Sequence, residues 1–340
     1  MIPVQNIYYL LCYAWDKLDE MDVVSVHETD SNDMLDLFTQ ILINGSKYLF
    51  KRGLDRYYIE NTEIFDGIKG KFLIDETIKR GVLNSKRTVC TFDDFSYNVL
   101  HNQILHTTLF RLFRTDNIDI DLRNQLKTVL FRFPTVDQIE LNARIFKQVQ
   151  LNKNNYFYDF LIKVCEIIFQ CTFIDRNTGN YKFKDFLQDD AKMRTLFESF
   201  VRNFYKKELD NYTVSREDIY WDFNPRDAYV PEMHTDITLQ SATRKIIIDT
   251  KFKRDTFQHP YNTDKIHSDN LYQLFAYLKN VEKKDEISRS CEGILLYPTV
   301  DQEVKLDYKI GNHPLKIRTI NLNQHWKKID KDLRNIIYEY

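Results

Sequence analysis

The alternation of hydrophobic and polar positions is clearest between residues 231 and 251. Ile237 and Leu239 alternate with polar side chains, which is the pattern of a strand with one buried face. Residues 246–248 are all isoleucine, which is typical of a strand buried on both faces. The polar or small residues 241–245 separate the two segments. We therefore predict a hairpin of two strands.

Helical spacing of apolar residues predicts an amphipathic helix on each side of this hairpin. The upstream stripe consists of Met193, Leu196, Phe197, Phe200, Val201 and Phe204. Glu198 lies at the edge of that stripe. Downstream, Leu271, Leu274 and Leu278 form a second stripe, and Gln273 and Tyr277 share a separate face because they are four residues apart. A core strand at 293–297, strands at 304–308 and 316–321, and a helix at 324–338 complete this half.

The pattern of residues in the first half of the chain predicts a different organisation. Helical patterns occur after Asn6, over 33–51, in two helices between 96 and 133, and over 156–173. Residues 56–92 differ in character. Residues 57–59 resemble a strand, and the segment contains Gly67, Gly70 and Gly81, which indicates a pair of strands with glycines at the tip. The Gly-Ile-Lys-Gly sequence at 67–70 lacks the Walker spacing, so we expect no nucleotide site in this chain.

Length indicates two domains, because 340 residues exceed what one hydrophobic core usually supports. Turn-forming residues cluster at 175–180 and place the boundary near residue 180. We expect an α+β protein, with a mixed N-terminal domain over 1–180 that carries a projecting β-rich element. An α/β domain follows over 181–340.

Charge and cysteine content restrict the classes of function. The chain has 48 basic and 50 acidic residues, so it cannot coat nucleic acid by bulk charge. Its five cysteines are scattered without a Cys-x-x-Cys motif, which argues against a disulfide framework or a zinc site and fits a reducing cytoplasm. The longest apolar run, residues 7–15, is too short to span a bilayer. We expect a soluble, cytoplasmic protein with no membrane partner.

Three residues of the hairpin carry candidate chemistry. Asp249 and Lys251 are two positions apart, so they project from the same face of the second strand, and Asp236 comes from the neighbouring strand. Two carboxylates suit Mg²⁺, and a lysine beside them can orient a water molecule or stabilise charge on a phosphate. The simpler alternative is a strand that ends at the surface with an Asp-x-Lys sequence.

The spacing of these residues resembles the PD-(D/E)xK nuclease superfamily. Gln273 and Tyr277, on the helix after the Asp-x-Lys strand, resemble the RecB-type branch, where such a pair borders the catalytic site. The superfamily often has an auxiliary acid on the upstream helix, and Glu198 occupies such a position; the alternative is a solvated helix glutamate. The usual proline before Asp236 is displaced to Pro231. The resemblance implies a magnesium-dependent nuclease with Asp236 and Asp249 as metal ligands.

Two further segments resemble the McrC family. The opening Ile-Pro-Val-x-Asn-Ile-Tyr-Tyr (residues 2–9) and the Asn-Thr-Glu-Ile…Gly-Ile-Lys-Gly block (residues 61–70) are similar to that family. McrC is the nuclease subunit of the McrBC restriction system. The resemblance implies a substrate of double-stranded DNA with modified cytosine. It also implies a partner ring of McrB, an AAA+ GTPase whose pore receives an N-terminal projection and whose GTP hydrolysis is stimulated. Lys69 and Lys71 are the candidate contacts with this partner.

Two classes of function remain open at this point. The chain is either an active nuclease that works within the motor complex, or a non-catalytic activator or structural subunit of the ring with a vestigial nuclease domain. The nuclease is favoured because the chain retains the complete set of candidate site residues: Asp236, Asp249, Lys251, Gln273 and Tyr277. The sequence does not indicate which modification is recognised, how the DNA is cut, or whether the partner uses GTP or ATP.

Overall fold

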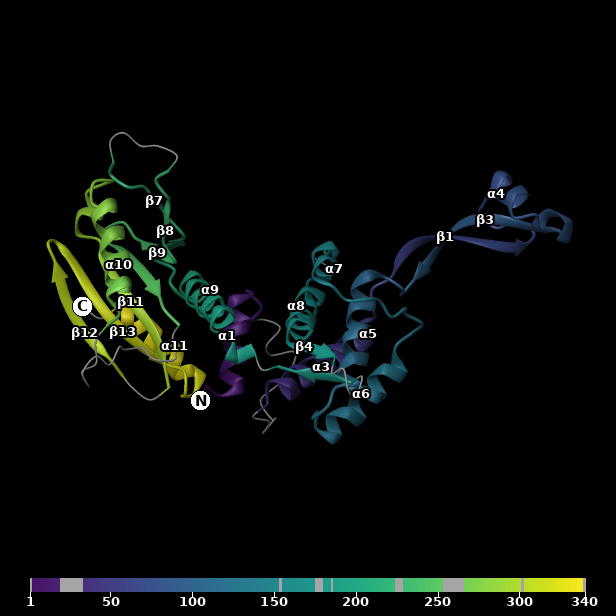
Figure 1. Cartoon of the computed structure of the whole chain (residues 1–340), viewed down its shortest axis with the longest axis horizontal. Helices are drawn as coiled ribbons and strands as arrows, with labels where there is room; N and C mark the ends of the chain where they lie inside the picture. The colour runs from purple at the N-terminus through teal and green to yellow at the C-terminus, as the bar shows by residue number, and fades with distance from the viewer. Residues whose placement is uncertain are drawn as a thin grey trace. The chain divides into compact units, whose positions relative to one another are not determined.

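The computed structural model describes residues 2–18, 33–152, 155–174, 180–184, 186–223, 229–252, 266–300 and 303–338 (Figure 1). The chain divides into two compact units. Unit 1 comprises Met1–Met34 and Asp185–Tyr340, and unit 2 comprises Leu35–Lys184. Both units contain helices and strands, as predicted for an α+β protein. Among the described residues, no helix is long and apolar enough to cross a membrane.

A mixed sheet of six strands lies at the centre of unit 1 within the described residues, in the order β12-β13-β11-β10-β9-β6. The strands are β6 (Thr213–Ser215), β9 (Ile237–Gln240), β10 (Lys245–Thr250), β11 (Glu292–Thr299), β12 (Lys305–Ile310) and β13 (His313–Asn321). β11 runs parallel to β10 and to β13, whereas the other neighbours are antiparallel. The predicted hairpin is confirmed, because β9 pairs with β10 and places Ile237 opposite Ile248.

Helices cover both faces of this sheet. Ile247 shares a core with Leu274 and Leu278 of α10 (Ser268–Val281), so α10 covers the face to which Ile247 points. Side chains alternate along a strand, so Ile246 and Ile248 point to the opposite face, where α9 (Asp190–Glu208) contacts β10. All three isoleucines are fully buried, which explains the uninterrupted apolar run.

A glycine allows α10 to pack closely on the sheet. A β-carbon at Gly293 of β11 would lie 2.9 Å from Leu278 Cδ1 and 3.1 Å from Leu274 Cδ2. The first distance is shorter than real contacts of a β-carbon and the second is tight, so a larger residue would force these two leucine side chains to shift. The close contact matters for the site, because α10 also carries Gln273 and Tyr277.

The first helix lies in a different unit from the one we predicted. α1 (Val4–Ala14) packs against α9 rather than against unit 2. The Asn6 side chain donates to the backbone carbonyls of Leu322 and Gln324, at 2.7 Å each, and the Tyr13 hydroxyl donates to Glu208 at 2.8 Å. Nearly every side chain of α1 is apolar and buried, so the helix needs surrounding partners that its own sequence neighbourhood does not supply.

The predicted C-terminal elements are also present. β12 and β13 form the strands expected after β11, and α11 (Trp326–Tyr338) packs against β13. The buried hydroxyl of Tyr205 on α9 donates to the carbonyl of Leu333 on α11, at 3.0 Å. The division between the two units at 184/185 is close to the boundary that we placed near residue 180. Residues 175–179 of the predicted turn cluster lie outside the described residues.

Unit 2 contains the helices that periodicity predicts, which are α3 (Met34–Arg52), α5 (Leu100–Phe113), α6 (Ile120–Arg132) and α8 (Tyr156–Cys171). The short helix α7 (Ala143–Gln148) and a short pair of strands, β4 (Thr172–Ile174) and β5 (Tyr181–Phe183), were not predicted. The buried Tyr158 hydroxyl on α8 donates to Asn102 Oδ1 at 2.8 Å and accepts the backbone N–H of Asp55 at 3.2 Å. These bonds attach the helices to the segment that leads into β1.

A β-ribbon leads away from these helices, as Figure 1 shows. β1 (Tyr57–Asp66) and β3 (Arg87–Ser96) are antiparallel along their whole length, and β2 (Lys71–Phe72) pairs with β3. Helix α4 (Ile74–Lys79) and the 3₁₀ turn η1 (Val82–Ser85) lie at the far end. Gly67 and Gly70 adopt positive φ angles of 114° and 71° at the turn, which side chains disfavour. The predicted pair of strands with glycines at its tip is therefore present, and we call residues 57–96 the projection.

Candidate active site

The candidate catalytic residues meet where β10 ends. Asp249 and Lys251 lie on the same side of this strand, and Lys251 Nζ is 2.7 Å from Asp249 Oδ2. Ile247 is two positions earlier, so Asp249 points to the face that α10 covers. The strand thus brings a carboxylate and an ammonium group together beside α10, as the spacing of two predicts.

Asp236 is held beside the same strand end by Thr250. Its Oδ2 accepts the Thr250 backbone N–H at 2.8 Å and the Thr250 hydroxyl at 2.9 Å. No sequence pattern indicated this role of Thr250. In a strand, the residue between Asp249 and Lys251 points to the opposite face, so periodicity alone gives no reason to include it. Only the path of the chain before β9 places the Asp236 carboxylate against both groups of Thr250.

A chain of hydrogen bonds orients Lys251. Its ammonium donates to Gln273 Oε1 at 2.8 Å, and Gln273 Nε2 donates to the Tyr277 hydroxyl at 2.7 Å. The Tyr277 hydroxyl donates in turn to the carbonyl of His234, at 2.9 Å, in β8 (Met233–His234). The structure therefore brings Gln273 and Tyr277 to the site, from the helix face that their spacing of four defines.

Glu198 also reaches this region, accompanied by two arginines. Its Oε1 lies 2.7 Å from Arg202 and 3.6 Å from Arg216. Arg202 also donates to the backbone carbonyl of Asp236, at 3.4 Å, and so connects Glu198 with the segment that carries Asp236. Neither arginine was among the predicted site residues. The spacing of four residues on one helix could have predicted the contact between Arg202 and Glu198, whereas no sequence pattern indicated Arg216.

Burial changes the acidity of Asp249. Its side chain is fully buried, and this raises the pKa of the carboxyl from 3.8 to about 7, against the opposing effect of the Lys251 ammonium. The negative charges of Asp236 and Glu198 raise the same pKa further. Tyr277 responds to burial in the same way, and its pKa rises to about 12. The phenol therefore stays protonated and can donate its hydrogen bond at neutral pH.

The carboxylates suit a hard divalent cation. Asp249 Oδ1 is buried and has no hydrogen-bond partner among the described residues, which is costly unless a ligand occupies its lone pairs. Within the part of the chain that the structure describes, no three His, Cys, Asp or Glu side chains meet to form a complete metal site. Mg²⁺ does not require such a set, because it binds through one or two carboxylates and keeps several waters. Asp236 and Asp249 are therefore the candidate metal ligands.

Comparison with known proteins identifies the family. A family model described as "McrBC 5-methylcytosine restriction system component" matches residues 5–298. The chain belongs to this McrBC component family. The resemblance to McrC seen in the sequence is thereby confirmed.

A curated relative supports the assignment to the McrBC family, and a solved structure has a similar fold. The chain is 34% identical over 344 residues to an Escherichia coli K12 protein described as "Type IV methyl-directed restriction enzyme EcoKMcrBC", covering 100% of this chain and 98% of that protein. Its fold is similar to a chain in the Thermococcus gammatolerans assembly of McrB AAA+ hexamers with bound McrC. The TM-score is 0.62 at 14% identity, covering 98% of this chain and 75% of that chain.

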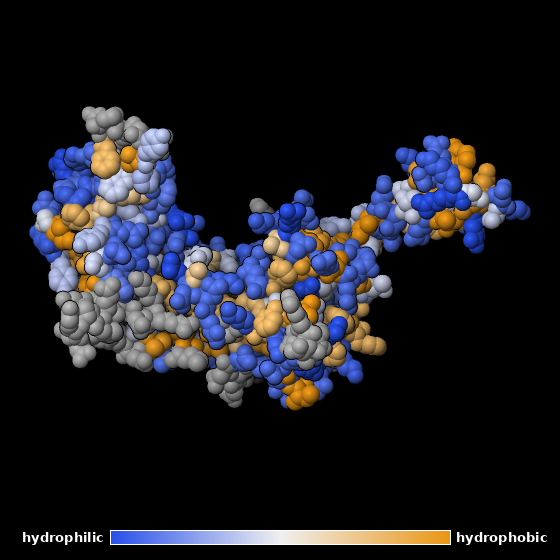
Figure 2. All heavy atoms as spheres, viewed as in Figure 1, coloured by the Kyte–Doolittle hydropathy of each residue, from blue (hydrophilic) through white to orange (hydrophobic). Residues whose placement is uncertain are grey.

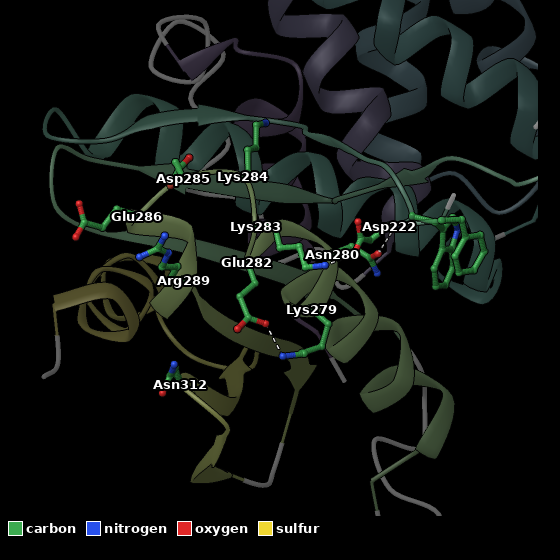
Figure 3. A pocket seen from close by; sticks show the side chains of 12 residues that line it. Asp222, Lys279, Asn280, Glu282, Lys283, Lys284, Asp285, Glu286, Arg289 and Asn312 are labelled. Carbon is green, nitrogen blue, oxygen red and sulfur yellow. Dashed lines mark hydrogen bonds and ion pairs between the residues drawn. The ribbon is translucent and has the colours of Figure 1, made fainter. Parts of the chain in front are cut away.

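A hollow of about 900 Å³ in this McrBC component lies apart from the candidate site. Figure 3 shows side chains of both charges around it, among them Lys279, which pairs with Glu282. Its lining contains four basic residues (Lys279, Lys283, Lys284, Arg289) and four acidic residues (Asp222, Glu282, Asp285, Glu286). None of the predicted site residues lines the hollow. Its balanced charge gives no preference for a polyanion such as DNA.

The two lysines predicted to contact a partner have different surroundings. Lys69 Nζ lies 3.7 Å from the centroid of the Phe92 ring and 5.1 Å from that of Phe65, so its charge stabilises the turn of the projection. Lys71 lies in β2, opposite Thr91 of β3, and is exposed. The structure therefore separates a lysine that packs on the projection itself from one that faces solvent.

The projection carries an apolar surface that we did not predict from the sequence. Ile68, Ile74, Ile78 and Leu83 are 71%, 58%, 63% and 55% exposed. Figure 2 shows hydrophobic side chains gathered at this end of the ribbon. Exposed apolar clusters of this kind are typical of contact surfaces. A usable signal was present, because Ile74 and Ile78 are four residues apart on α4 and share a face. We call these four residues the apolar tip.

Proposed function

We propose that the chain is the endonuclease subunit of a modification-dependent restriction complex. Its reaction is the magnesium-dependent hydrolysis of phosphodiester bonds in double-stranded DNA that contains modified cytosine. The observation that carries this proposal is the convergence of Asp236, Asp249 and Lys251 at the end of β10. Family membership and the description of the Escherichia coli relative as a methyl-directed restriction enzyme support the choice of substrate.

The proposal assigns residues 185–340 to the PD-(D/E)xK nucleases. A sheet that carries Asp-x-Lys on a central strand, with helices on both faces, supports this assignment. Asp236 and Asp249 hold Mg²⁺ in this proposal. When bound, the metal supplies Lewis-acid polarisation of a phosphoryl oxygen and acidifies its water.

The remaining side chains prepare the site for charge on the phosphate. Lys251, oriented by Gln273 and indirectly by Tyr277, stabilises the negative charge that develops on the phosphoryl oxygens during hydrolysis. Glu198 acts as the auxiliary acid, and its charge keeps the proton affinity of Asp249 high when no metal is bound. Thr250 keeps the Asp236 carboxylate beside the end of β10.

The proposed partner is an AAA+ ring similar to McrB. The Thermococcus gammatolerans assembly, in which McrB AAA+ hexamers bind McrC, supports this choice. Unit 2 is the proposed partner-binding domain, and its projection is the element that stimulates GTP hydrolysis by the ring. We propose that the complex is cytoplasmic; the five buried, free cysteines support this choice, because they suit a reducing compartment.

We expect the chain alone neither to cut DNA nor to hydrolyse GTP. Its net charge is −2, and its sequence has no phosphate-binding loop, so neither DNA nor nucleotide should bind tightly at physiological salt. With an McrB-like partner, GTP and Mg²⁺, we expect cleavage of a duplex with modified cytosine but not of the unmodified duplex. Gel analysis of both duplexes, with EDTA as the metal-free control, measures this.

The same assay separates the two classes of function. A non-catalytic activator would raise GTP turnover by the partner without any cleavage. Robust nicking of unmodified DNA by the purified chain alone would contradict dependence on the motor.

The apolar tip provides a test of partner binding. We expect the double substitution Ile74→Ser, Ile78→Ser to reduce stimulation of partner GTP turnover on the order of tenfold, because a few well-packed contact residues, each contributing more than about 1 kcal/mol, dominate most interfaces. Both side chains are exposed, so the melting temperature should change little. Ile120→Ser on α6 is the matched control, since Ile120 is 66% exposed outside the projection. Equal stimulation by the double variant and this control would exclude the tip.

The two lysines should behave differently from each other. Lys71→Ala should lower stimulation without changing stability, whereas Lys69→Ala should also lower the free energy of unfolding by roughly 0.5–1 kcal/mol, through loss of its contact with Phe92. Chemical denaturation and GTP turnover of both single variants measure the difference. A fully stable Lys69→Ala variant would show that the ring contact contributes nothing to the fold.

A further inference from the structure

Arg216 lies in a segment that is firmly attached to the candidate site. Two backbone-centred hydrogen bonds join its neighbour Glu217 to Thr235, the residue before Asp236. The Glu217 N–H donates to Thr235 Oγ1 at 2.9 Å, and the Thr235 N–H donates to the Glu217 carbonyl at 3.0 Å. The Glu217 carboxylate also pairs with Lys245, which is only 2% exposed, at 2.8 Å. The backbone of Arg216 is thus held in a defined position next to Asp236.

The Arg216 side chain differs from that of Arg202 in how it is engaged. Arg202 forms a 2.7 Å ion pair with Glu198, and its side chain is 22% exposed. Arg216 lies 3.6 Å from the same carboxylate, and its side chain is 55% exposed. Its other hydrogen bond, to the carbonyl of Thr235, is long at 3.5 Å. Arg202 therefore fixes Glu198, whereas the guanidinium of Arg216 faces solvent with weak contacts at the edge of the site.

Because the site is rich in carboxylates, a DNA phosphate that approaches it needs an accessible positive side chain to bind. The carboxylates of Asp236, Asp249 and Glu198 repel a phosphate backbone. Lys251 opposes them but is engaged by Asp249 and Gln273. The positive charge of Arg216 is close enough to lower the pKa of Tyr277, which the Asp249 and Asp236 charges raise. Arg216 is therefore near the same group of side chains, and it is the more exposed of the two arginines that contact Glu198.

We propose that Arg216 binds a backbone phosphate of the DNA strand that enters this site. The inference rests on the proposed nuclease function and adds a substrate contact to it. A guanidinium presents a planar set of donors that matches two phosphate oxygens, which an ammonium group cannot do. The contact is to the backbone, so it holds the strand in register at the carboxylates without reading a base.

The test compares Arg216→Ala and Arg216→Lys in the complete complex with the McrB-like partner. In single-turnover cleavage of a duplex with 5-methylcytosine, we expect Arg216→Ala to be about 10²-fold slower than wild type. Arg216→Lys should recover part of this loss, because it keeps the charge but not the fork. Arg289→Ala is the matched control and should cut normally. Arg289 is exposed and precedes β11, whose first residue pairs with the beginning of β10, away from Asp249.

DNA affinity, measured with Mg²⁺ in complexes that also carry Asp249→Ala and should not cut, provides a readout that does not depend on cleavage. With non-hydrolysable GTP present, loss of one phosphate contact should reduce the slope of log affinity against log salt by about 0.9 in Arg216→Ala. The slope should be unchanged in Arg289→Ala. If Arg216→Ala destabilises the chain, Arg216→Gln carries the test. It removes the charge but keeps most of the side chain, and the reduced slope and slower cleavage are expected of it as well.

The outcomes separate this inference from the proposed function. If Arg216→Ala cuts DNA at the wild-type rate and its affinity has the wild-type dependence on salt, the proposed phosphate contact is wrong. Slower cleavage with a wild-type slope in Arg216→Ala would also overturn it, because Arg216 would then act only by positioning Glu198. Cleavage by an Asp249→Ala complex would instead show that the nuclease site itself is elsewhere.

Discussion

Replacing Asp249 or Lys251 with alanine is expected to abolish DNA cleavage, by more than about 10²-fold, while partner GTP turnover stays stimulated. Asp249 supplies a proposed metal ligand, and Lys251 is the ammonium that Gln273 holds at the same strand end. Both residues belong to unit 1, whereas the projection belongs to unit 2. The loss should therefore affect the chemistry without affecting the proposed stimulation of the motor.

Cleavage and GTP turnover must be measured on the same preparations of the assembled complex. Lys309→Ala, an exposed lysine on β12, is the control for removal of a charge from the same sheet. Wild-type cutting by either site variant would remove this site from consideration. Loss of GTP stimulation together with cleavage, in a folded variant, would show that the two units are coupled more tightly than we propose.

The second prediction with a large expected effect is that the stability of unit 1 without metal falls as the pH rises. The pKa of Asp249 is raised from 3.8 to about 7 in the folded chain, mainly by burial. Below pH 4 the carboxyl is protonated in both states. Between pH 4 and 7 only the unfolded state releases the proton, so the Asp249 contribution to stability falls as the pH rises and is fully lost above 7. A difference of about three pH units corresponds to at most about 4 kcal/mol.

Asp249→Asn should remove this dependence, because asparagine has no proton to release. Without metal, the variant should therefore match wild type near pH 4 and exceed it in stability at pH 8. Denaturant unfolding at both pH values measures the difference. Equal stability of the two proteins at pH 8 would show that the buried carboxylate is better compensated than its contacts indicate.

Added Mg²⁺ should reduce this difference in stability at pH 8. A ligand that binds only the folded state stabilises it by mass action, so the wild-type melting temperature should rise with Mg²⁺ concentration. Asp249→Asn lacks one of the two proposed ligands and should show little or no rise. An equal rise in both proteins would place the metal away from Asp236 and Asp249.

Much of this molecule follows from short-range periodicity. The three isoleucines of β10, the spacing of Asp249 and Lys251, and the spacing of Gln273 and Tyr277 on α10 are all local patterns. The face to which each of these side chains points depends on strand alternation and helical pitch, which the backbone imposes in any context. The hairpin, the two flanking helices and the side chains that α10 presents could therefore be predicted without the fold.

The remaining features depend on residues that are distant in the sequence. α1 packs with α9 because a helix that is apolar on all sides must be buried, and nothing near it in the sequence can cover it. Thr250 and Arg216 reach the site because the segment around Thr235 joins β9 to the end of β10 and to Glu217. Lys69 packs on Phe92, which lies across the strand pair from it. The sequence by itself determined which side chains share a face, whereas only the tertiary structure decided which faces meet, because burial and charge pairing act between segments that no local pattern connects.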